Sequence, residues 1–353
     1  MICALFDAVE SLAPGTVAVV GLAKNCGKTT ALNALLGEYA RRGFDLAATS
    51  AGRDGEAVDA LTLEAKPPIE LPGGALAATA ERTLERWAAP FEELGRLGVS
   101  SSVGEIVLVR STAPGMAELA GPPTVAGMRR ALEELRRLGA GRILIDGAFD
   151  RIAVGDPGVT DAVVLAAGAV LAGSAESVAG IVAHRAGLLG LRRPEGEAAA
   201  RLSGVAEALG SRAAAVSEGF DVQVLPESAL ADPVRTAEAA GGAKWLLCGG
   251  AVEDGLLRSL AESGAKVNVV ARDATRIFVE PATLGRWLGA EGGLHVLRRV
   301  KLAAIVTNPH NPTGPDLAAA ELARAVASAV EGVPVFDVVA GISHNTGAGS
   351  GGH

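Results

Sequence analysis

The chain has 353 residues, of which 49% are hydrophobic but only 3% aromatic, and its formal net charge is −8. This length is comfortable for two domains, and a core of Ala, Val, Leu and Ile suits helices packed on parallel strands. The acidic balance, without a long run of Lys or Arg, argues against a nucleic-acid partner.

The cysteines and histidines do not form a pattern. Three cysteines and five histidines are scattered without the spacing of a zinc site or a disulfide framework. The N-terminus has no basic start and reaches Asp7 too early for a signal peptide, and the longest apolar stretch, 162–173, is too short for a bilayer. We therefore expect a cytoplasmic protein that does not act in a membrane.

The first half of the chain predicts alternating strands and helices. Apolar runs predict strands at 16–21, 45–50, 105–109, 142–145 and 163–166. Helical patterns are found at 28–42, 76–94, 125–138 and 174–189. Continuous apolar strands separated by helices predict a parallel sheet covered on both faces.

The pattern loosens at 192–200, where we place a domain boundary. Further strands are expected at 222–225, 244–248, 267–270, 294–297, 303–307 and 333–338, with helices at 254–263 and 316–330. The predicted division is a first α/β domain at 1–195, a second α/β domain at 196–340 and a flexible tail at 341–353.

Residues 21–30 lie between the first predicted strand and the first predicted helix. Strand, glycine-bearing turn, Gly-Lys-Thr and helix is the layout of a phosphate-binding P-loop, in which backbone N–H groups and a helix N-terminus face an anion. Lys28 is predicted to reach the outer phosphates of ATP and the Thr29 hydroxyl to ligate Mg²⁺. The other residues expected to contact the nucleotide are Gly21, Lys24, Asn25, Cys26, Gly27 and Thr30. The first domain is therefore predicted to be a P-loop NTPase-like nucleotide-binding domain.

The loop is one residue longer than the usual pattern, because five residues separate Gly21 from Gly27. This spacing resembles the dethiobiotin synthetase type of loop, in the group that includes nitrogenase-iron-protein-like and signal-recognition GTPases. Some members carry an extra lysine; Lys24 is the candidate, although it stands three residues before Gly27 rather than four. Cys26 is expected to fill the loop, with a redox-sensing role as the alternative.

Two carboxylates are candidates for the magnesium site and for catalysis alongside Lys28. Asp146 directly follows the apolar strand 142–145, and Asp54, with Glu56 nearby, follows the strand at 45–50. A carboxylate delivered by an apolar strand is what the metal site of a P-loop protein needs. The alternatives are a helix cap or turn for Asp146 and an ordinary turn for Asp54.

Several turn clusters also follow predicted strands. Residues 111–115 are expected to line the same crevice as the loop. Residues 249–251, 273–275 and 308–312 are candidates for a second ligand or partner site in the second domain, ordinary turns being the alternative.

Together these motifs resemble the P-loop subunit of lysine 5,6-aminomutase reactivase. The resemblance covers most of the chain and rests on residues 21–30, 49–56, 145–151, 273–278, 308–309 and 334–338. It implies an ATP-hydrolysing repair factor that ejects damaged cobalamin from an adenosylcobalamin-dependent aminomutase. It also implies two protein partners, the aminomutase and a MutS-like ATPase subunit.

Two other functions stay open. A ligase or kinase of the dethiobiotin synthetase type would use the same loop to phosphorylate a small acid. A non-hydrolysing scaffold subunit would bind ATP only to organise a complex.

Overall fold

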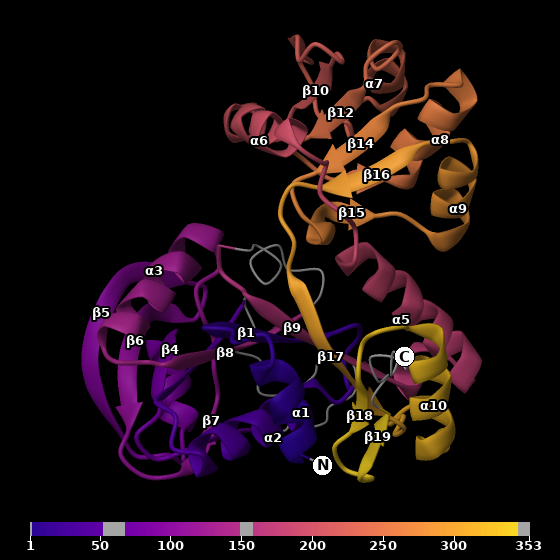
Figure 1. The fold of residues 1–353 in the computed structure, drawn as a ribbon. Coiled ribbons are helices and arrows are strands. Elements are labelled where there is room, and N and C mark those ends of the chain that lie inside the picture. Colours follow the sequence, from indigo (N-terminus) through magenta and orange to yellow (C-terminus); the bar gives the residue numbers. More distant parts are fainter. Residues whose placement is uncertain (1, 52–67, 149–157, 345–353) are drawn as a thin grey trace, which may run out of the picture. The chain divides into compact units, whose positions relative to one another are not determined.

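The computed structural model describes residues 2–51, 68–148 and 158–344. The chain divides into two compact units (Figure 1). Unit 1 comprises Met1–Ala186 and Val300–His353, and unit 2 comprises Gly187–Arg299. Unit 2 is therefore an insertion in the chain of unit 1.

Unit 1 is built on one large sheet. In spatial order its described strands are β19 (Ile342–His344), β18 (Val335–Asp337), β17 (Lys301–Asn308), β9 (Ala162–Gly168), β1 (Thr16–Gly21), β8 (Arg142–Ala148), β2 (Leu46–Ser50), β4 (Leu76–Ala80), β6 (Gly104–Ser111) and β5 (Phe91–Ser101). The strands from β18 to β4 run parallel to their neighbours, whereas β19, β6 and β5 pair antiparallel. A separate small ladder joins β3 (Ile69–Leu71) to β7 (Gly115–Ala117).

Helices cover both faces of this sheet. Helices α1 (Ile2–Glu10) and α2 (Lys28–Arg41) share a core with Leu144 and Val164. Helices α3 (Val125–Arg137), α5 (Ala175–Leu189) and α10 (Ala319–Ala329) pack on the other face, where Ile145 and Leu165 point. Short 3₁₀ helices are η1 (Glu81–Arg86) and η2 (Ala169–Leu171). The predicted α/β architecture with a large, mainly parallel sheet is confirmed.

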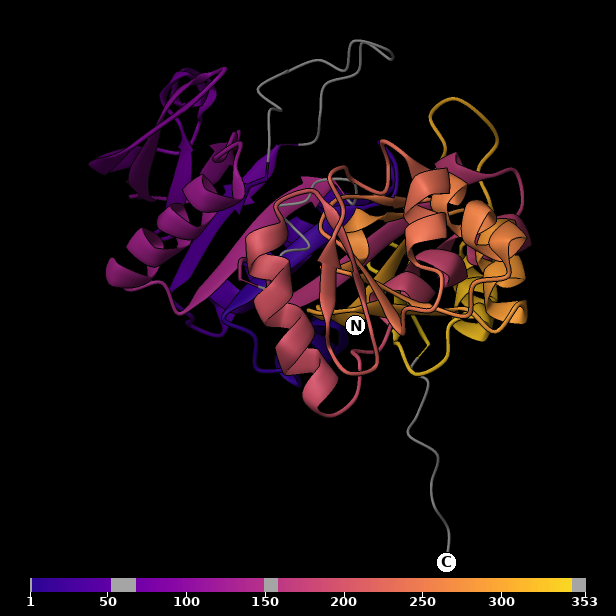
Figure 2. The ribbon, with the colours of Figure 1, turned by 90° about the horizontal axis from the view of Figure 1, so that it is seen from above.

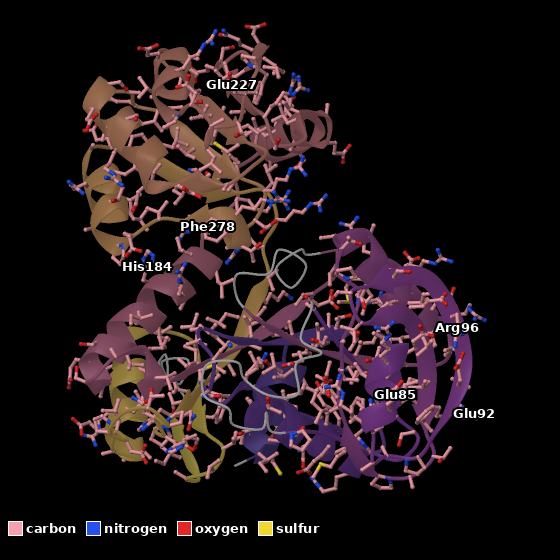
Figure 3. All side chains as sticks on the ribbon, turned by 180° about the vertical axis from the view of Figure 1, so that it is seen from behind. Glu85, Glu92, Arg96, His184, Glu227 and Phe278 are labelled. Atoms are coloured by element: carbon pink, nitrogen blue, oxygen red, sulfur yellow. The ribbon has the colours of Figure 1, made fainter. Side chains whose placement is uncertain are left out.

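Unit 2 has its own five-stranded sheet. The spatial order is β11 (Val222–Val224), β10 (Ala213–Val216), β12 (Trp245–Cys248), β14 (Asn268–Ala271) and β16 (Gly293–Val296), of which the last three are parallel. Helix α6 (Glu197–Leu209) covers one face. Helices α7 (Pro233–Ala239), α8 (Asp254–Ser263) and α9 (Pro281–Gly289) cover the other, as Figure 2 shows. The remaining elements are β13 (Val252–Glu253), η3 (Ala274–Arg276) and β15 (Ile277–Phe278), whose Phe278 is labelled in Figure 3.

The predicted domain limits, 196–340 for the second domain, are wrong at the C-terminal end. Strands β17 and β18, placed in the second domain by prediction, belong to the large sheet of unit 1. Helix α10, placed there as well, packs on this sheet. Apolar periodicity locates a strand but does not say which sheet it joins. The predicted tail at 341–353 begins too early, because β19 pairs with β18; residues 345–353 lie outside the described residues.

The predicted helix at 76–94 is also wrong. The segment forms β4, η1 and the start of β5. Its Ala, Glu and Arg residues have high helix propensity, but all five residues of β4 are buried between β2 and β6. Burial in a sheet therefore overrides the local preference of this segment.

The outer edge of the large sheet is charged. Strand β5 lies at that edge, and its Arg96, labelled in Figure 3, pairs with Glu81 at 2.8 Å, Glu93 at 3.0 Å and Glu105 at 3.2 Å. Charged side chains on an edge strand disfavour pairing with another chain. None of the helices in the described ranges has the length and apolarity needed to cross a bilayer.

Candidate functional site

The turn between β1 and α2 holds two residues with left-handed backbone. Asn25 has φ 58°, and Gly27, which precedes the first residue of α2, has φ 90° and ψ 10°. The N-cap residue, Gly27, has no side chain to cap this helix, and the backbone N–H of Lys28 donates to the Cys26 thiol. Such a turn at the N-terminus of a 14-residue helix fits an anion.

Gly21 is required by close packing inside the turn. A Cβ atom at this position would lie 2.7 Å from Cys26 Sγ and 3.2 Å from the Ala23 carbonyl oxygen. Cys26 is buried, and burial raises the pKa of its thiol, an effect that hydrogen bonds from neighbouring backbone groups and the charge of Lys28 only partly offset. A neutral, buried thiol matches the expectation of a loop filler and gives no support to a reactive thiolate.

We predict that Gly21→Ala weakens ATP binding about tenfold and lowers the free energy of unfolding by about 1–3 kcal/mol, because the new methyl group collides with Cys26. Calorimetric titration with ATP and thermal unfolding measure the two effects. Gly21→Ala/Cys26→Ala removes the colliding sulfur and should recover most of both. Gly37→Ala is the control, since a Cβ there meets no atom within 4 Å; unchanged ATP affinity in Gly21→Ala would contradict the packing argument.

The Lys28 ammonium and the Asp146 carboxylate form an ion pair. Lys28 Nζ lies 3.1 Å from Asp146 Oδ1, with side-chain exposures of 23% and 19%. Asp146 is on β8, which pairs with β1 in parallel register, so the carboxylate and the turn lie at the same edge of the sheet. Asp146 Oδ1 is buried and has no hydrogen bond of good geometry within the described residues, which leaves it able to accept one.

The other predicted residues of the turn lie around this pair. Thr29 is half-buried in the first turn of α2, whereas Lys24, Asn25 and Thr30 are exposed. No cluster of three or more His, Cys, Asp and Glu residues suited to a metal occurs in the described part of the chain. One carboxylate and one hydroxyl are enough protein ligands for Mg²⁺. This ion keeps several of its waters and takes further ligands from substrate phosphates, so it rarely needs a site made of protein ligands alone.

Two further predictions for this site are not confirmed. Asp54 and Glu56 lie outside the described residues. The cluster at 111–115 was expected beside the loop, and this is wrong: β6 is antiparallel to β4 and pairs Arg110 with Leu76, the first residue of β4, so Ser111 ends at the opposite edge of the sheet.

Asn308 contacts the turn, a role that the sequence did not indicate. It ends β17 and donates from Nδ2 to the Asn25 carbonyl oxygen at 2.8 Å. A Cβ at Gly27 would lie 2.9 Å from Asn308 Cβ, and one at Gly168 would lie 2.7 Å from the Asn308 carbonyl oxygen. Asn308 was assigned to a second site in the second domain, whereas it holds the left-handed residue of the turn in place. The sequence shows a polar residue at the end of an apolar strand, but it does not show which sheet that strand joins.

We predict that Asn308→Ala lowers ATP affinity about 3–10-fold, because one hydrogen bond that fixes the turn is lost. Asn308→Asp should lower it further, since a carboxylate places an acceptor against the Asn25 carbonyl oxygen and adds negative charge. Asn311→Ala is the control: Asn311 Nδ2 donates to the Ala169 carbonyl oxygen at 3.4 Å, in the same segment. Equal losses in both alanine variants, measured by calorimetry, would show that Asn308 has no special part in holding the turn.

Comparisons of this chain with protein-family models, with curated proteins and with solved structures found no match.

Proposed function

We propose that this chain binds ATP with Mg²⁺ through residues 21–30 and hydrolyses it, as a P-loop NTPase does. The observation that carries the proposal is the Lys28–Asp146 pair, at 3.1 Å, beside the N-terminus of α2. The order β2–β8–β1–β9–β17, all parallel, supports it, because the strand with the carboxylate is the direct neighbour of the strand that leads into the turn.

Each side chain has a role that its position supports. The N–H groups of the turn and of α2 would bind the phosphates, and Lys28 would exchange Asp146 for a phosphate oxygen. Asp146, so released, would orient the hydration shell of the metal together with Thr29. Magnesium would neutralise the charge that develops on the phosphates. The exchange is balanced, because both members of the ion pair gain a new partner of opposite charge.

We propose further that this activity serves a reactivating factor for an adenosylcobalamin-dependent aminomutase, lysine 5,6-aminomutase, together with a MutS-like ATPase subunit. The support is the set of sequence motifs that resemble that family. Parts of three of these motifs, 21–30, 145–148 and 308–309, lie at one edge of the unit 1 sheet.

The test is ATP hydrolysis by the purified protein, alone and then with the inactivated aminomutase and the MutS-like subunit. Recovery of aminomutase activity that needs ATP and is lost in Lys28→Ala would support the reactivase. ADP release stimulated by a small acid, without recovery, would assign a ligase or kinase instead. ATP binding without turnover under every condition would assign a scaffold subunit.

A further inference from the structure

Unit 2 contains a cavity of about 560 Å³ that the proposed ATPase function does not use. It is lined by the first turn of α6 and by Trp245, Asn268 and His295. These three side chains share one face of the sheet, because Trp245 pairs with Asn268, and Asn268 pairs with Gly293, two residues before His295. The volume is in the range of sites for small organic molecules.

The polar part of the wall is fixed in place. Asn268 Nδ2 donates to the Lys244 carbonyl oxygen at 3.2 Å, which leaves Oδ1 to accept from His295 Nε2 at 3.2 Å. Gly293 makes this contact possible, because a Cβ there would collide with Asn268 Oδ1. The His295 ring also meets Trp245 edge-on, with 5.8 Å between ring centroids. Asn268 and two aromatic rings therefore form a rigid surface.

A third aromatic residue, Phe220, lies at the cavity and has an unfavourable backbone conformation. Phe220, in the turn between β10 and β11, has φ 66°, a conformation that costs a bulky residue free energy and suits Gly or Asn. Its ring nevertheless lines the cavity, with the Arg201 guanidinium 4.8 Å from the ring centroid. Backbone strain of this kind is concentrated at ligand sites.

Three basic and three acidic residues line the cavity, and ion pairs engage some of them. Lys244 pairs with Glu218 at 2.6 Å, and Glu197 pairs with Arg201 at 2.6 Å. Because Arg201 lies outside the lining but occupies Glu197, the charged lining residues outside these two ion pairs are Arg192, Arg193 and Glu195. Guanidinium groups bind carboxylate and phosphate oxygens in a bidentate manner.

We propose that this cavity binds a small molecule that combines a flat aromatic part with a carboxylate or phosphate group. Phe220, Trp245 and His295 would contact the flat part, and Arg192 and Arg193 would bind the oxyanion. The cavity lies at the amino ends of β12 and β14, whereas sheets of this kind usually bind ligands at their carboxyl ends. Recognition of a ligand at this cavity therefore depends on side chains.

The test is ligand-observed NMR and calorimetry with benzoate and phenyl phosphate, using benzyl alcohol and inorganic phosphate as probes that lack one of the two features. The full chain is used in a Lys28→Ala background, so that phosphate binding at residues 21–30 neither mimics nor masks the result. We expect a Kd of about 0.1–1 mM for at least one of the two aromatic anions. Preference between the two distinguishes a carboxylate ligand from a phosphate ligand.

Two variants locate the binding. Arg192→Gln/Arg193→Gln should weaken it about tenfold or more. Phe220→Asn should weaken it while keeping the turn, since Asn tolerates a positive φ, and thermal unfolding checks that the fold is kept. Arg235→Gln, in α7 on the other face of unit 2, is the matched control. The proposal is overturned if neither aromatic anion binds below about 1 mM, if benzyl alcohol binds equally well, or if both variants bind like the control.

Discussion

Lys28→Ala is expected to lower ATP affinity about 100-fold or more, because charge-assisted hydrogen bonds to the phosphates are lost. The same change leaves the Asp146 carboxylate without the ammonium 3.1 Å away. We therefore expect the free energy of unfolding to fall by about 1 kcal/mol as well. Calorimetric titration with ATP and denaturant unfolding measure the two effects.

A second substitution separates the two effects. Lys28→Ala/Asp146→Asn should regain the lost stability, since a neutral amide needs no counter-charge, but it should not regain ATP affinity. Lys301→Ala, an exposed lysine at the start of β17, is the control for loss of one positive charge. If Lys28→Ala bound ATP with wild-type affinity, residues 21–30 would not be the nucleotide site.

Asp146→Asn is expected to reduce Mg²⁺-dependent ATP hydrolysis about 10–100-fold, because the metal's hydration shell loses a charged acceptor. ATP affinity without Mg²⁺ should instead rise, since Lys28 no longer has to leave a carboxylate before it reaches a phosphate. Steady-state hydrolysis and titration with EDTA present distinguish the two.

Asp7→Asn, which changes an exposed carboxylate on α1, is the control for the loss of one negative charge. Hydrolysis at the wild-type rate in Asp146→Asn would clear Asp146 of a metal role. A fall in ATP affinity without the metal would mean that Lys28 does not bind the phosphates in the way proposed.

Local patterns in the sequence were sufficient to predict the centre of unit 1. The apolar strands β1 and β8 were predicted from such patterns, and the structure pairs them side by side, with Lys28 Nζ 3.1 Å from Asp146 Oδ1. The roles of these two residues at a nucleotide and a metal stay a prediction. Cys26, which is expected to fill the turn, is buried there.

Long-range pairing could not be predicted in the same way. Segment 76–94 has the composition of a helix, and only its neighbours in the sheet make its first part a strand. The contact of Asn308 with Asn25 joins residues separated by 283 positions in the chain. Nothing local to either residue indicates it, because it depends on β17 returning to the sheet that β1 begins.

The insertion of unit 2 between β9 and β17 has a consequence for synthesis on the ribosome. Residues 187–299 emerge before the strand that completes the neighbouring sheet, and they have their own core, so unit 2 can fold first. A nascent chain that stops short of Asn308 lacks the hydrogen bond to Asn25, although Lys28 and Asp146 have long been translated. The proposed ATP site is therefore completed late in translation, and we expect truncated or stalled chains to bind the nucleotide weakly.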